Sequence, residues 1–153
     1  MPVTTLDRQV SHRWPVFLPD GRHFLFYAQG PPDTGGIFLG ALDAKTPTRL
    51  TAADTAGTYL PGGPGRAEAL GEGGWLLWVR GGTLVAQGLD LARLALTGDS
   101  VPLADAVTVD AIRGAVSVSA TGLVAYRAGG ASRRQLTWRD RSGTGAGHAG
   151  RPR

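Results

Sequence analysis

The sequence predicts an all-β fold: a partial, open β-propeller of about three four-stranded antiparallel blades. Three observations lead to this prediction. Short apolar runs recur along the chain, 24 glycines and 10 prolines separate most of them, and a turn followed by an apolar strand returns with a period near 50 residues. The turn is clearest at Pro19–Gly21, and the apolar strands contain Leu25, Leu76 and Val124. One supersecondary unit per repeat is typical of propeller blades.

The repeats divide the chain into three parts. Residues 1–12 are polar and lack periodicity, so we interpret them as a leader or the remnant of a preceding element. Residues 13–143 form the partial propeller, with units at about 13–55, 56–105 and 106–143. Residues 144–153 hold no apolar residue larger than alanine, so this tail is expected to be disordered.

The first unit begins with Arg13–Leu18, where Pro15 cannot donate a ladder hydrogen bond, which suits an edge or inner short strand. Pro19-Asp20-Gly21 forms a turn, because proline sets φ, aspartate bonds its own backbone and glycine accepts a positive φ. A strand from His23 to Ala28 follows, and its two apolar faces predict cover on both sides. Phe24 and Phe26 share one face, and Leu25 and Tyr27 share the other. Ile37–Asp43 and Thr48–Leu50 complete the unit.

The second unit opens with Thr58–Leu60 and has its strongest strand at Trp75–Arg80. Gly81-Gly82 predicts a hairpin turn to Thr83–Leu89. Leu89–Leu96 is ambiguous, because it alternates like a strand while Ala and Leu favour helix, and we expect a loop with at most one helical turn.

The third unit starts near Val107 and contains three apolar or alternating runs. In Ala115–Ser119 the residues Val116 and Val118 are expected to point inward. Leu123–Arg127 returns after a turn, and Arg134–Asp140 is the next strand.

Composition excludes several classes of site. The chain has no cysteine, so disulfides, thiolate metal sites and cysteine nucleophiles are absent. No run approaches the ~18 apolar residues of a spanning helix, and the N-terminus has no apolar signal-peptide region. Residues 113–153 hold eight arginines and one aspartate, whereas residues 1–112 hold 8 Lys/Arg and 11 Asp/Glu. Coding bias and a solvated face explain this skew better than a nucleic-acid or anionic-lipid footprint does.

Candidate site residues have structural explanations that outweigh the functional ones. His12, His23 and His148 have no second ligand at metal spacing, and no cofactor is expected. Ser117 and Ser119 lie on an alternating strand and not on a nucleophile elbow. Three acidic residues are explained by turns in or beside which they fall: Asp20, Asp43 and Asp140. Four aromatic residues are expected in the core of the blades: Trp14, Trp75, Trp78 and Trp138. Arg133, Arg134, Arg139 and Arg141 could contact phosphates beside Trp138, but on a strand Arg139 and Arg141 form an ordinary outward polar face.

The order of several motifs is similar to that of a known family. The motifs are Trp14-Pro-x-Phe17-Leu-Pro-Asp-Gly-Arg-His23-Phe, Gly36-Ile-Phe-Leu-Gly-x-Leu42, Trp78-Val-Arg-x-Gly-Thr-Leu84-x-Ala-Gln87, Leu94-x-Leu-Thr-Gly98, Val116-Ser-Val-Ser-x-x-Gly-x-x-Ala-Tyr126 and Gln135-Leu-Thr-Trp-x-Asp-Arg-x-Gly143. Together they resemble the TolB-like (WD-type) β-propeller region that follows the catalytic domain in bacterial serine/threonine protein kinases of acidobacterial type. The resemblance covers residues 13–143 and implies a propeller outside the cytoplasmic membrane that acts as a sensor or interaction surface.

The chain departs from that family in the parts that would carry chemistry. It lacks the glycine-rich phosphate loop, the His-Arg-Asp catalytic loop and the Asp-Phe-Gly motif of kinases, so no enzyme activity is expected. A membrane span is also absent, and about three units are fewer than the usual four to eight blades, so the sequence resembles a fragment.

The leading hypothesis is therefore a non-catalytic interaction or sensor module whose protein or small-molecule partner the sequence does not identify. The alternatives are a propeller fragment of a peptidase-type or Tol-type periplasmic protein, and a nucleic-acid binder that uses the C-terminal arginines. Binding to metal or nucleic acid is not expected. Self-association through open blade edges is a further expectation, because unpaired strand edges tend to associate.

Overall fold

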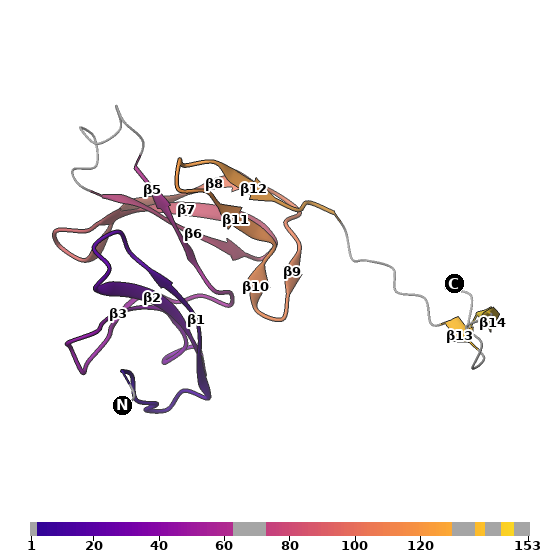
Figure 1. Cartoon of the computed structure of the whole chain (residues 1–153), viewed down its shortest axis with the longest axis horizontal. Helices are drawn as coiled ribbons and strands as arrows, with labels where there is room; N and C mark the ends of the chain where they lie inside the picture. Colours follow the sequence, from indigo (N-terminus) through magenta and orange to yellow (C-terminus); the bar gives the residue numbers. More distant parts are fainter. Residues whose placement is uncertain (1–2, 63–72, 130–136, 140–144, 149–153) are drawn as a thin grey trace.

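Every regular element in the described part of the computed structural model is a β-strand (Figure 1). The structure describes residues 3–62, 73–129, 137–139 and 145–148. The described strands form open antiparallel sheets. The predicted all-β class, with open four-stranded antiparallel sheets, is therefore confirmed. Within the described ranges no helix is long and apolar enough to span a membrane.

The first sheet has the order β1-β2-β3-β4. Its strands are β1 (Ser11–Phe17), β2 (His23–Gln29), β3 (Gly36–Ala41) and β4 (Thr48–Thr51). The turn at residues 19–22 connects β1 to β2, and both side-chain faces of β2 are buried from Phe24 to Ala28, as the two-sided apolar pattern predicts.

The second sheet repeats this meander with the order β5-β6-β7-β8. Its strands are β5 (Thr58–Pro61), β6 (Gly74–Arg80), β7 (Thr83–Asp90) and β8 (Ala95–Ala104). The loop expected over Leu89–Leu96 is shorter than predicted and covers only residues 91–94. Leu89 and Asp90 still belong to β7, and β8 begins at Ala95. The turn between them is short because the Asp90 carboxylate accepts hydrogen bonds from the backbone N–H groups of Ala92 and Arg93, each at 2.9 Å.

The third unit is built from two-stranded sheets in the described residues. These are β9 (Val109–Asp110) with β10 (Arg113–Gly114), β11 (Val116–Val118) with β12 (Val124–Tyr126), and β13 (Thr137–Arg139) with β14 (Gly145–His148). Two of the expected four-stranded units are thus complete, and the third differs. Within the tail expected to be disordered, Gly145–His148 pair with β13, because backbone pairing needs no large side chain. Residues 144 and 149–153 lie outside the described residues.

Backbone direction distinguishes two faces of each four-stranded sheet. His23 O accepts from Leu18 N at 2.8 Å, so the backbone groups of the odd-numbered residues in β2 point toward β1. In β6 the backbone N and O of Val79 are hydrogen-bonded to Thr55 Oγ1, and Thr55 lies just before β5 in the chain. The backbone groups of the odd-numbered residues in β6 therefore point toward β5. In strands of L-residues this direction determines the face that the side chain takes, so Leu25 is equivalent to Leu77. We call this face the rear and the opposite one the front.

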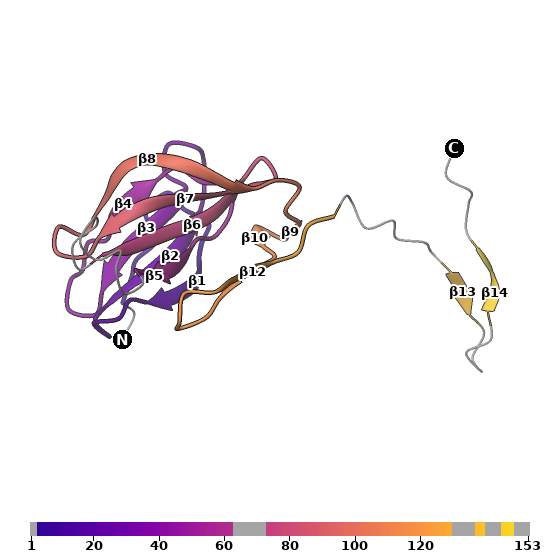
Figure 2. The same ribbon diagram turned by 90° about the horizontal axis from the view of Figure 1, so that it is seen from above.

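The two sheets pack front to rear. The rear face of the first sheet (Leu25, Tyr27, Ile37 and Leu39) and the front face of the second (Leu76, Trp78, Val85 and Leu89) form one buried cluster. The rear face of the second sheet (Leu77, Val79, Leu84 and Ala86) packs with Val107 and with Val116, Val118 and Val124 of β11 and β12. Val116 and Val118 therefore face inward, as predicted. Figure 2 shows the strands of the second sheet layered against those of the first.

The front face of the first sheet (Phe24, Phe26, Ala28 and Phe38) forms a buried cluster of its own, which includes no described residue from another sheet. Phe26 lies between the other two rings, with centroids 5.8 Å from Phe24 and 5.5 Å from Phe38. The face comparison also corrects the repeat. A period of 51 residues pairs Leu25 with Leu76, but these two side chains lie on opposite faces of their sheets. A period of 52 residues pairs Leu25 with Leu77, which lies on the equivalent face.

Candidate functional site

A cleft of about 260 Å³ opens where β1, β5, β6 and the β9–β10 hairpin meet. Trp14, Trp78 and Arg113 line it, with Val116 and Gly57 among the apolar residues of its wall. We call it the Trp14–Arg113 cleft. A wider surface hollow shares Trp14, Arg113 and Val116 with it and continues over Tyr126 and Arg127.

A β-bulge places Trp14 at this cleft. Arg13 pairs with Tyr27 and Val16 pairs with Leu25, so Trp14 and Pro15 together face the single residue between those partners. Trp14 has φ = 58°, a left-handed conformation that non-glycine residues rarely adopt. Its indole is therefore turned out of the alternating pattern and is 41% exposed. The expectation that Trp14 belongs to the blade core is wrong for this reason.

The β9–β10 turn presents Arg113 to the same place. Asp110 pairs with Arg113 across a two-residue turn, Ala111-Ile112, in which both φ angles are positive at 43° and 73°. Glycine and asparagine usually occupy such turns, so this backbone is strained, and strained residues concentrate at functional sites. The Arg113 Cζ lies 4.9 Å from the centroid of the Trp14 ring, a cation–π contact.

The cleft presents hydrogen-bond donors and a positive charge. Among the described residues no carboxylate lies within ion-pair distance of Arg113, although its guanidinium carries five N–H donors. Trp78 Nε1 is buried and has no hydrogen-bond acceptor in the described part of the chain. The residues that line the cleft include no histidine, aspartate or glutamate. The arrangement offers the N–H donors and positive charge of Arg113 beside the Trp14 ring, and its lining supplies no general acid or base at neutral pH.

The acidic residues of the first sheet are engaged in turn chemistry, as predicted. Asp20 Oδ1 accepts from the backbone N–H of Arg22 at 3.0 Å and of His23 at 2.9 Å, and its Oδ2 lies 2.5 Å from His23 Nδ1. The contact with the His23 side chain and then these backbone bonds lower the pKa of Asp20 to about 2. Asp43 pairs with Arg22, whose hydrogen bond lowers the pKa of the Asp43 carboxyl. Both carboxylates are stable anions that position a hairpin.

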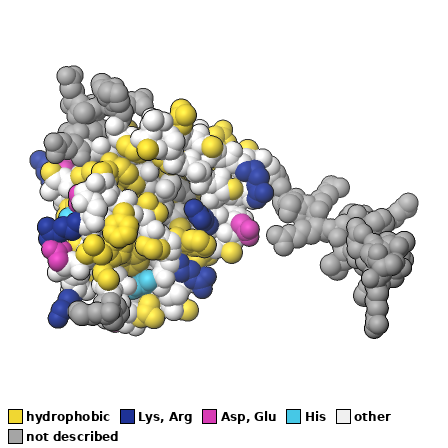
Figure 3. Space-filling view, viewed as in Figure 1, with side chains coloured by type: hydrophobic (Ala, Val, Ile, Leu, Met, Phe, Trp, Pro, Cys, Tyr) yellow, Lys and Arg dark blue, Asp and Glu magenta, His cyan; other side chains and the backbone are white. Residues whose placement is uncertain are grey.

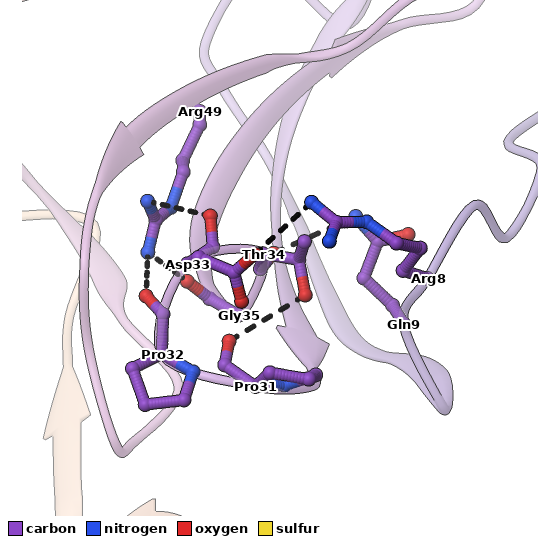
Figure 4. Close-up of polar contacts among 8 residues, drawn as sticks. All are labelled: Arg8, Gln9, Pro31, Pro32, Asp33, Thr34, Gly35 and Arg49. Carbon is purple, nitrogen blue, oxygen red and sulfur yellow. Dashed lines mark hydrogen bonds and ion pairs between the residues drawn. The ribbon is translucent and has the colours of Figure 1, made fainter.

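Figure 4 shows how Arg49 of β4 and the segment before β1 both bind the β2–β3 loop. Arg49 donates to the carbonyl oxygens of Pro32 at 2.8 Å and Asp33 at 3.2 Å, and also to that of Gly35. Arg8 forms an ion pair with Asp33 at 3.0 Å, and Gln9 Nε2 donates to Thr34 O at 3.5 Å. The contacts are structural, since each arginine donor meets a carbonyl oxygen or a carboxylate of the loop.

The remaining predicted residues are placed as follows. His12 Nδ1 lies 2.9 Å from Thr4 Oγ1, and the imidazole packs 4.7 Å from Phe26. Ser119 Oγ accepts from Leu123 N at 3.0 Å and so closes a turn. Within the described residues no group of three or more His, Asp or Glu side chains could hold a metal ion.

Two of the tryptophans behave as the core prediction requires. Trp78 is 3% exposed, and the half-buried Trp75 packs against the second cluster. Seven further candidates lie where the structure describes no side chain: Trp138, Asp140, His148, Arg133, Arg134, Arg139 and Arg141.

Sequence reasoning did not single out Arg113. It is one arginine among eight in the C-terminal part, and no motif surrounds it. Searches found no family model, no curated protein and no solved structure that matches the chain.

Proposed function

We propose that this chain is a non-catalytic interaction or sensor module that holds a partner or ligand in the Trp14–Arg113 cleft. The observation that carries the proposal is the Arg113 guanidinium over the exposed face of Trp14, without a carboxylate partner among the described residues. A guanidinium binds carboxylate or phosphate oxygens through paired N–H donors, and an indole stacks on planar groups. The fitting ligand group is therefore an anion attached to an apolar or aromatic body.

The open propeller-like stack is compatible with a parent protein of the bacterial serine/threonine kinase type, which the motif order resembles. In such a parent the catalytic domain would precede this segment, and the cleft would act as the sensing surface. The coding sequence upstream tests this part of the proposal. A kinase catalytic domain in the same reading frame supports it, and a peptidase or a Tol-type protein there contradicts it.

The cleft itself is tested with small probes. Benzoate and phenyl phosphate should quench or shift tryptophan fluorescence saturably, whereas neutral benzyl alcohol should not, because it offers no anion to Arg113. Affinities in the millimolar range are expected for ligands of this size. Arg113→Gln should weaken benzoate binding at least fivefold. Arg80→Gln, which changes an exposed arginine at the end of β6, is the matched control. Equal binding to both variants would contradict the proposed site.

A further inference from the structure

The front face of the first sheet is the large apolar surface that the described chain leaves without a covering sheet. Its aromatic cluster consists only of residues from β2 and β3, and each of the four is at most 8% exposed. Beside it lie Phe17, which is 56% exposed, and Leu42, which is 53% exposed. Figure 3 shows hydrophobic side chains gathered over the strands of this sheet, with charged side chains of both signs at the border. The exposed side chains of Phe17 and Leu42, next to this aromatic cluster, are typical of an interaction site.

The surface has the shape of a groove with projections beside it. The groove has a volume of about 310 Å³, and Val3 and Thr4 of the N-terminal segment form one wall. The buried Phe24 and Phe26 and the exposed Phe17 and Leu42 all line it. Phe17 packs edge-on against Phe24 with centroids 5.9 Å apart, so its ring is fixed in position although it is exposed.

The second sheet shows what covers the equivalent face. There the front face is buried by the rear face of the first sheet. Leu89 of the second sheet is equivalent to Leu42 of the first, 47 residues earlier, and it is 1% exposed. The same kind of surface is therefore buried where the molecule supplies a layer for it, and the layered interface would continue at the first sheet if a further apolar layer were present.

A second copy of the chain can supply that layer in one orientation. The outward face of β11–β12, at the other end of the stack, presents Ser117 opposite Ala125, which are small or polar. A head-to-tail contact would therefore place the aromatic front face against a poor partner. If two front faces meet instead, the exposed side chains of each copy contact the groove of the other. The same contact is then made twice, which is the self-complementary arrangement that a twofold axis requires.

Charge at the border of the front face permits this contact. Arg13 and Arg22 are balanced by Asp20 and Asp43, and Arg22 is already paired with Asp43. Two identical borders therefore meet without a net like charge, which would otherwise oppose association.

We propose that two copies of this chain associate through their front faces about a twofold axis, with Phe17 and Leu42 of each copy against the groove of the other. This contact differs from the edge-to-edge pairing expected from the sequence, because it buries side chains and leaves the strand edges free. It does not depend on the Trp14–Arg113 cleft.

The test is sedimentation equilibrium of the full chain at 1–100 µM, on the order of typical interface affinities. The expected mass is twice the 15.9 kDa of one chain. Phe17→Ser and Leu42→Ser should each weaken dimerisation at least tenfold, since a twofold interface loses each contact twice. Leu103→Ser on β8, whose side chain is 50% exposed, is the matched control and should leave the dimer unchanged. Circular dichroism checks that all three variants fold.

Four results would overturn the proposal. The first is a wild-type monomer over the whole concentration range. The second is a dimer that Phe17→Ser and Leu42→Ser leave intact, which would indicate pairing at strand edges. The third is equal dissociation by Leu103→Ser, and the fourth is growth beyond a dimer, which a closed twofold contact forbids.

Discussion

The two four-stranded sheets have the same topology, yet in the described part of the chain further strands pack on both faces of the second sheet and on only one face of the first. Leu42 and Leu89 show the difference at equivalent positions, since one is exposed and the other buried. The covered face of the second sheet carries Leu, Trp and Val, whereas the open face of the first carries three phenylalanines that pack on one another. Aromatic rings can thus shield each other where a neighbouring layer is missing.

The largest expected difference between the sheets is the effect of truncating these two leucines. Leu89→Ala should lower the free energy of unfolding by about 3 kcal/mol, because it opens a cavity between two packed layers. Leu42→Ala should cost less than about 0.5 kcal/mol in the monomer, because an exposed side chain leaves no cavity. Urea denaturation at low micromolar concentration measures both. Equal costs would mean that the two front faces are covered alike.

The connection between the sheets should be the next most sensitive place. Thr55 is 2% exposed, and its Oγ1 donates to Val79 O at 2.7 Å and accepts from Val79 N at 3.1 Å. Thr55→Val keeps the shape but leaves two buried backbone groups unpaired, so we expect a loss of about 2 kcal/mol. Thr83→Val, which removes an exposed bond to Asp105, is the control and should change stability by less than about 0.5 kcal/mol. A similar loss in both variants would contradict the structural role of Thr55.

Replacing a glycine by alanine should cost more stability beneath the third unit than on the front face of the first sheet. A Cβ at Gly114 would lie 2.5 Å from Val79 Cγ2, beneath the third unit, and a Cβ at Gly40 would lie 2.6 Å from the Phe24 ring. Gly114→Ala should cost about 2 kcal/mol, since the new methyl group would displace Val79, which is 1% exposed and packed in the second cluster. Gly40→Ala should cost about 1 kcal/mol, because the Phe24 ring can shift toward the groove. Thermal unfolding of the two variants checks the order, and the reverse order would contradict it.

The sequence predicts the strands well because each strong strand is an apolar run bounded by turn residues. It is harder to predict on which face of its sheet each side chain lies. When the loops between two units differ in length by one residue, the repeat becomes one residue longer or shorter. Because side chains alternate along a strand, this moves the matched residue to the other face. The same limit applies to the candidate site, because the left-handed φ of Trp14 and the turn before Arg113 are properties of the folded backbone.

The smallest expected effect is a pH dependence at the open face. Partial burial against Phe26 lowers the pKa of His12, so the unfolded chain binds a proton more readily than the folded chain. Stability should therefore fall as pH decreases through about 6.5, the ordinary histidine pKa. His12→Gln should reduce this fall, and urea denaturation at pH 7.5 and 5.5 measures it. An unchanged pH profile in the variant would assign the dependence to other groups.

The most direct test of the front-to-rear arrangement is thiol labelling, since the chain has no cysteine of its own. Leu42→Cys and Leu89→Cys each introduce one thiol, at equivalent positions of the two front faces. At concentrations where the chain is monomeric, the thiol at position 42 should react with a disulfide reagent about as fast as a free thiol. The thiol at position 89 should react only as fast as the protein opens. Equal reaction rates at the two positions would contradict the arrangement.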